Sequence, residues 1–156
     1  MKKGKKILVS ACLLGENCKY SGESNYNQKV IDFLKESGCT PVLVCPEVMG
    51  GLPTPRVPAE IRGEQVVTAD GRDVTMEFMR GAQLVLKTAK ENDCSLAVLK
   101  ERSPSCGCGR IYDGTFSKTV IAGDGITARL LKSAGIRILG EEGLEQAEEL
   151  ALLTGK

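Results

Sequence analysis

The segment Lys6-Ile7-Leu8-Val9-Ser10-Ala11-Cys12-Leu13-Leu14 decides the fold class of this chain. It is short and almost wholly apolar, without the alternation of a strand that has one face in water, and it predicts a strand buried on both faces. A helix is predicted over Asn27–Ser37, where apolar side chains recur at helical spacing, and a second apolar strand over Pro41–Val44. Together these segments predict a βαβ unit with parallel strands.

The same alternation continues along the chain. Helices are predicted over Val74–Asn92, Ile126–Ser133 and Leu144–Leu153, and strands over Ser95–Leu99 and Ile136–Leu139. The segments 50–70, with a β-type patch at Gln65–Thr68, and 103–125 are rich in glycine or proline and predict long ordered loops. We expect an α/β, Rossmann-like three-layer sandwich around a mostly parallel sheet of about four strands, in a single domain spanning 1–156.

The composition excludes several kinds of chemistry. The chain has 7 cysteines and no histidine, which rules out Ser-His-Asp and Cys-His catalysis and mixed Cys/His zinc sites. Its 21 basic and 20 acidic residues give no basic surface for nucleic acid. The apolar run before Cys12 is too short for a signal peptide, and no run approaches the ~18 residues of a membrane span.

These absences set expectations about cell compartment and partners. We expect a cytoplasmic protein whose thiols stay reduced, acting on a small molecule as a monomer or small homo-oligomer, with neither a membrane nor a nucleic acid as partner.

Three cysteines fall just after predicted parallel strands. Cys12, Cys45 and Cys106 follow the first, second and third strands, so they are expected to meet at the carboxyl edge of the sheet, where such folds bind ligands. Cys39 and Cys94 lie at the opposite end and are expected to pack in the core. The roles of Cys18 and Cys108 stay open.

Three converging thiolates suit several soft metal centres. Zinc, Cu(I) and iron–sulfur clusters all accept such ligands, and three protein ligands leave a fourth position open for chemistry. Without histidine, a cysteine-only [4Fe–4S] cluster is the natural candidate. The alternatives are a metal-binding, sulfur-carrier or redox protein that uses the same cysteines without hydrolytic activity.

Five ordered motifs resemble the bacterial family catalogued as domain of unknown function 523, which includes thiouracil desulfidases. They are Ser10-Ala11-Cys12-Leu13-Leu14-Gly15, the stretch from Cys45-Pro46-Glu47 to Pro55-Arg56, Lys100-Glu101-Arg102-Ser103-Pro104-Ser105-Cys106-Gly107, Ile111-Tyr112-Asp113-Gly114 and Gly125-Ile126-Thr127-Ala128. The resemblance covers nearly the whole chain. One departure is Lys19-Tyr20-Ser21, where the family pattern has arginine, tyrosine and aspartate.

The resemblance implies a desulfidase that releases sulfide from a thiolated uracil or its nucleotide by non-redox hydrolysis. It implies a [4Fe–4S] cofactor held by Cys12, Cys45 and Cys106, whose open iron binds the departing sulfur. By motif, Glu47 and Ser103 take the catalytic roles, with Ser105 as the less favoured serine and a substrate-binding residue. Arg56, in a proline-braced loop, is expected to bind a phosphate or carbonyl group, with Lys100 and Arg102 as weaker candidates.

Overall fold

The computed structural model describes residues 5–144. Its central sheet has four parallel strands in the order β2-β1-β5-β8. These strands are β1 (Lys6–Ser10), β2 (Thr40–Val44), β5 (Leu96–Leu99) and β8 (Arg137–Gly140). The parallel sheet confirms the predicted fold class, and the strand order reverses direction between β1 and β5, which is where such sheets open a crevice for ligands.

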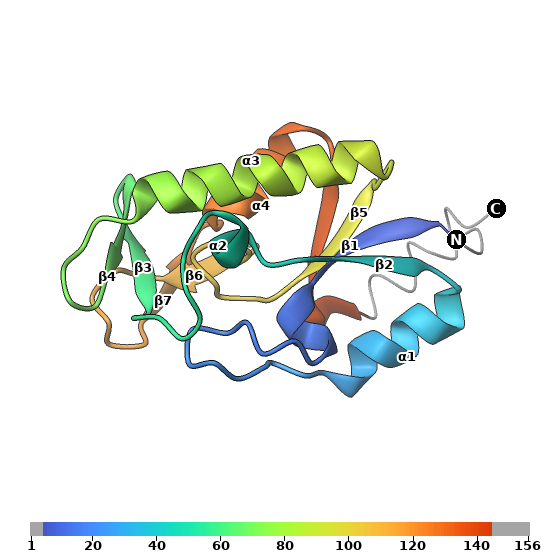
Figure 1. Cartoon of the computed structure of the whole chain (residues 1–156), viewed down its shortest axis with the longest axis horizontal. Helices are drawn as coiled ribbons and strands as arrows, with labels where there is room; N and C mark the ends of the chain where they lie inside the picture. The colour runs from blue at the N-terminus through green and yellow to red at the C-terminus, as the bar shows by residue number, and fades with distance from the viewer. Residues whose placement is uncertain (1–4, 145–156) are drawn as a thin grey trace.

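Helices cover both faces of the sheet (Figure 1). On one face α1 (Gln28–Ser37) contributes Val30 and Phe33 to a core with Ile7 and Val9 of β1. On the other face α3 (Thr75–Glu91) and α4 (Ile126–Ser133) pack on Leu8 of the same strand. Adjacent residues of β1 thus serve opposite cores, as expected for a strand that is apolar on both faces.

The first strand is shorter than predicted. It ends at Ser10, and Ala11–Leu14 form the 3-10 helix η1, which Gly15 ends with a left-handed φ of 100°. Leu13 is buried in the core beneath α1, so the apolar character of this segment reflects packing of a turn and not a longer strand. Cys12 therefore lies on a tight turn at the carboxyl edge of the sheet.

Two β-hairpins stand where the sequence predicted loops. β3 (Ala59–Arg62) pairs with β4 (Gln65–Thr68), and β6 (Arg110–Tyr112) pairs with β7 (Val120–Ala122), both antiparallel. The β-type patch at Gln65–Thr68 is confirmed as β4, but its partner was missed because prolines dominate the preceding segment. All three residues of β7 are exposed, so this strand carries no apolar alternation to reveal it.

The remaining elements are short. α2 (Pro46–Met49) is a single turn that follows β2, and the 3-10 helix η2 (Glu141–Gly143) follows β8. Beyond Leu144, the predicted closing helix lies outside the described residues. No helix within 5–144 has the length and apolar character needed to cross a membrane.

Candidate functional site

A cavity of about 630 Å³ opens at the carboxyl edge of the sheet, with the two hairpins forming its outer wall. Cys12, Cys45 and Cys106 all line it, together with Cys18. The strand ends thus bring the three predicted cysteines to one cavity although they come from distant parts of the sequence. The volume falls within the usual range for small-molecule sites.

Cys12 and Cys45 lie beside the same third thiol. A hydrogen bond from Cys18 lowers the pKa of each to about 7, against an ordinary value of 9.0. Cys12 also accepts a hydrogen bond from Asn25 Nδ2 at 3.3 Å, and the Val48 backbone amide in the following helical turn further lowers the pKa of Cys45. Cys18 has a single S–H hydrogen and can donate it to only one of these neighbours at a time, and these contacts raise its own pKa. Each of the two thiols therefore loses its proton more readily than an ordinary cysteine, and the thiolate is the form that binds metal.

Cys106 has a different environment. It is buried, and burial raises its pKa, while a hydrogen bond with Ser10 opposes that effect. Its turn is fixed by Ser103, whose Oγ accepts the amide N–H groups of Ser105 and Cys106, each at 3.1 Å. Ser10 Oγ also accepts the Lys100 amide at 2.9 Å, which joins the ends of β1 and β5 directly.

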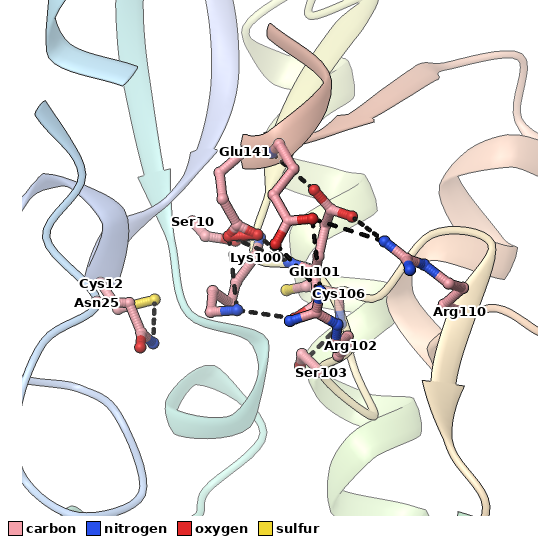
Figure 2. A network of polar contacts seen from close by, with 11 residues as sticks. Ser10, Cys12, Asn25, Lys100, Glu101, Arg102, Ser103, Cys106, Arg110 and Glu141 are labelled. Carbon is pink, nitrogen blue, oxygen red and sulfur yellow. Dashed lines mark hydrogen bonds and ion pairs between the residues drawn. The ribbon is translucent and has the colours of Figure 1, made fainter. Parts of the chain in front are cut away.

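A polar network joins the segment after β5, which leads to Cys106, to the end of β8 (Figure 2). Glu141, at the end of β8, is buried and accepts the Glu101 amide at 2.7 Å, while its Oε2 lies 3.5 Å from Lys100 Nζ. Burial raises the pKa of Glu141. Glu101 in turn accepts the Glu142 amide and pairs with Arg110. The predicted binding residue Lys100 is thus held by a neighbouring carboxylate.

Glu47 and Arg56 form an ion pair in the cavity wall. Arg56 NH2 lies 2.6 Å from Glu47 Oε2, and their side chains are 5% and 19% exposed. The same guanidinium donates to the backbone oxygen of Cys18 at 2.9 Å and to Pro53 and Thr54. Arg56 thus lines the cavity as predicted, and its guanidinium also braces Glu47 and the segments around Cys18 and Pro53.

Other predicted residues separate into those inside and outside the cavity. Ser103, Ser105 and Arg102 line the cavity, but Ser105 is buried with its hydroxyl 2.8 Å from that of Thr127, and Arg102 pairs with Glu142. Cys108 is not among the lining residues and hydrogen-bonds with Lys132. Cys39 and Cys94 are buried in the cores on opposite faces of the sheet, as expected.

The donor set suits an iron–sulfur cluster. The cavity presents soft thiols from three different elements, and two of them have a lowered pKa. Within 5–144, no three His, Cys, Asp or Glu side chains are arranged to hold a single metal ion. A cluster makes a different demand, because each of its cysteine ligands binds a separate iron.

Sequence reasoning left out three polar residues of this site. Cys18 had no assigned role, yet it touches both Cys12 and Cys45, and Asn25 and Ser10 each hydrogen-bond a site thiol. Only Cys18 carried a signal in the sequence, as a fourth cysteine close to Cys12. Asn25 reaches the site through the loop between η1 and α1, and such loop placement leaves no periodic pattern.

Comparisons with known proteins place this arrangement in a family. The family model described as 2-thiouracil desulfurase matches residues 7–143. The uncharacterized protein YbbK of Bacillus subtilis (strain 168) is 47% identical over 148 residues, which cover 88% of this chain and 97% of YbbK. A solved structure of the [4Fe–4S]-dependent thiouracil desulfidase TudS is 49% identical with a TM-score of 0.87, covering 95% of this chain and 99% of that one. The chain belongs to the 2-thiouracil desulfurase family.

Proposed function

We propose that this protein is a [4Fe–4S]-dependent desulfidase that removes sulfur, as sulfide, from thiolated pyrimidines by non-redox hydrolysis. The observation that carries the proposal is the meeting of three strand-end cysteines and a Glu–Arg ion pair in one cavity. The family and the resemblance to TudS support the same activity and cofactor. The substrate is a base or a nucleotide, and the reduced thiols suit the cytoplasm.

Cys12, Cys45 and Cys106 would hold the cluster. With three protein ligands, a bound cluster supplies one open iron as a Lewis acid for the thiocarbonyl sulfur. Cys18 remains beside two of these ligands as a hydrogen-bond donor. The two thiols that it contacts lose their protons most readily, which favours them as ligands at neutral pH.

Glu47 is placed to handle the protons of an attacking water. Its Oε2 is held by Arg56, while Oε1 has no hydrogen-bond partner among residues 5–144 and belongs to a side chain that lines the cavity. A carboxylate fixed in this way can accept a proton from water as its oxygen adds to the thiocarbonyl carbon, and can pass that proton to the sulfide as the C–S bond breaks. Arg56 orients the Glu47 carboxylate and influences the substrate through it.

Ser103 retains a hydrogen atom to donate. Its oxygen accepts two backbone amides, which leaves the hydroxyl hydrogen available to a substrate or water in the cavity. Ser105 lies farther into the core, and its bond with Thr127 ties the Cys106 loop to α4. We therefore assign Ser103 to orienting substrate or water, and Ser105 to supporting the cavity wall on which substrate binds.

The test is anaerobic reconstitution with iron and sulfide, followed by a sulfide-release assay on 2-thiouracil, 4-thiouracil and their nucleotides. We expect a brown protein that releases sulfide without an added reductant. Cys12→Ala, Cys45→Ala and Cys106→Ala should lose the cluster, whereas Cys108→Ala, outside the cavity, should keep it. One bound zinc with no inorganic sulfide would instead support the metal-binding alternative.

A further inference from the structure

Glu60 is a buried carboxylate without a basic partner. It lies on β3 and is 9% exposed, and among residues 5–144 no lysine or arginine forms an ion pair with it. Its neighbour Ile61 packs in the core with Phe78, on the opposite face of the hairpin. Burying a carboxylate without an ion-pair partner is costly, so the hydrogen bonds that each of its oxygens makes or leaves open decide its role.

The two oxygens of Glu60 have different surroundings. Oε1 accepts the amide N–H groups of Gly114 at 3.0 Å and Phe116 at 3.1 Å. Oε2 has no hydrogen-bond partner in the described part of the chain. Every fully buried side-chain oxygen there does have one, so Oε2 is not fully buried. Oε2 is therefore accessible, and because Glu60 lines the cavity, it is an acceptor open to a ligand there.

Phe116 lines the same cavity and is held in an unusual conformation. Its φ is 58°, in the left-handed region that a bulky side chain rarely adopts. The loop that carries it is fixed by Glu60 and by Arg62, whose Nε and NH2 donate to the Gly114 oxygen at 3.2 and 2.7 Å. A hydrogen bond between Asp113 and Thr119 closes its base. Phe116, whose strained backbone is bonded to Glu60, and the open oxygen of that carboxylate thus both line the same cavity.

We propose that Glu60 and Phe116 recognise the pyrimidine ring, with the Phe116 ring stacking on its face and Glu60 Oε2 accepting its N3–H. The inference rests on the proposed function and specifies the substrate. Uracil-type rings carry N3–H in both base and nucleotide, whereas neutral cytosine-type rings present a lone pair there. Because a carboxylate attracts the first and repels the second, the wall selects thiolated uracils over thiolated cytosines.

The deciding variant is Glu60→Gln. The amide oxygen can keep the two loop hydrogen bonds, while the NH₂ group turned to the cavity becomes a donor. We expect an unchanged cluster content, a rise in KM for 2-thiouracil on the order of 10-fold, and at least a comparable fall in the preference for 2-thiouracil over 2-thiocytosine. Glu64→Gln, on the exposed turn between β3 and β4, is the matched control.

Phe116 has a different expected signature. Phe116→Leu should raise KM for both substrates on the order of 10-fold without altering the preference between them, since stacking is insensitive to ring hydrogen bonds. Phe116→Tyr keeps an aromatic ring and should leave KM for both substrates close to the wild-type values. Val120→Ala, on an exposed strand of the same hairpin and outside the cavity lining, should behave as wild type.

Calorimetric titration with uracil, which cannot react, separates this inference from the proposed function. Wild-type protein that binds uracil but releases no sulfide from 2-thiouracil would contradict the proposed desulfidase activity and support ring recognition by Glu60 and Phe116. If Glu60→Gln releases sulfide with an unchanged preference between 2-thiouracil and 2-thiocytosine, the assignment of ring recognition to Glu60 is wrong, while the proposed desulfidase activity stands. Urea unfolding of each variant identifies loss of fold, and wild-type protein that does not bind uracil overturns the inference directly.

Discussion

Arg56 joins Glu47 to the loop that carries Cys18: its NH2 lies 2.6 Å from Glu47 Oε2 and 2.9 Å from the Cys18 oxygen. A single guanidinium therefore fixes the carboxylate and the backbone of the thiol that contacts Cys12 and Cys45. A fork of several donors suits this task, because one side chain must satisfy acceptors from separate segments at once. The Glu47 carboxylate and the Cys18 backbone are thus held by the same guanidinium.

Replacing Arg56 by lysine should destabilise the fold although the charge is kept. Lysine cannot reproduce the simultaneous bonds to Glu47, Cys18 and the 53–54 backbone and side chain, so we expect a loss of about 2 kcal/mol in the free energy of unfolding. Urea denaturation of the cluster-free protein measures it. Arg72→Lys is the control, because its pair with Asp70 is 63% and 53% exposed and should change stability by less than about 0.5 kcal/mol.

Glu47→Gln should separate cluster binding from catalysis. The amide keeps a hydrogen bond to Arg56 but cannot accept a proton from water, so we expect normal cluster content and a fall in kcat of roughly 10²–10⁴-fold. Iron and sulfide analysis together with sulfide-release kinetics provide the measurement. Full turnover in this variant would remove Glu47 from the proton-transfer role, and Glu64→Gln, at an exposed position, should leave both quantities unchanged.

The thiols of the cluster-free protein should titrate in two groups. The pKa of Cys12 and of Cys45 is lowered to about 7 by the hydrogen bond from Cys18, whereas burial raises the pKa of Cys106. Iodoacetamide reacts with thiolates, so peptide mass spectrometry should find Cys12 and Cys45 labelled at neutral pH while Cys106 stays unlabelled.

The sign of the linked stability effect follows from the same shifts. A lowered thiol pKa favours the folded state above the ordinary value of 9.0, and that contribution is lost as the pH falls through about 7. In Cys18→Ala both labelling midpoints should move up towards 9.0. Unchanged midpoints would mean that Cys18 does not donate to these thiols.

The sequence predicts the sheet well because its strands are apolar without interruption. Pro41 does not disturb β2, since this strand lies at the sheet edge, where a missing N–H is tolerated. The two hairpins escape prediction for a physical reason. Their strands are three or four residues long and owe their order to contacts such as those of Glu60 and Arg62 with the 113–119 loop.

The candidate site divides in the same way. Strand ends and topology are enough to bring Cys12, Cys45 and Cys106 to one cavity, because parallel strands place their carboxyl ends at one edge. The partners of individual side chains depend on loop conformation, so the sequence alone does not reveal the ion pair between Arg56 and Glu47. Glu60 was missed because a glutamate in a short, proline-flanked segment has no pattern that marks it as buried.

A glycine in the middle of α3 offers a test in which the expected sign is reversed. Gly81 packs against α2, and a Cβ there would overlap the Pro46 backbone oxygen. Alanine normally stabilises a helix interior relative to glycine by about 1 kcal/mol. Here it would push away the turn that carries Cys45 and Glu47, so Gly81→Ala should lower both the free energy of unfolding and the cluster content.

Urea unfolding and iron analysis on Gly81→Ala, beside Gln83→Ala on the exposed face of the same helix, measure both quantities. The control should unfold as wild type or slightly later and bind the full cluster, since it alters helix propensity without touching α2. A stabilised Gly81→Ala protein with full cluster content would contradict the close contact between the two helices. Loss of cluster at unchanged stability would instead locate the effect at Cys45, because the turn would have moved without unfolding the helix that supports it.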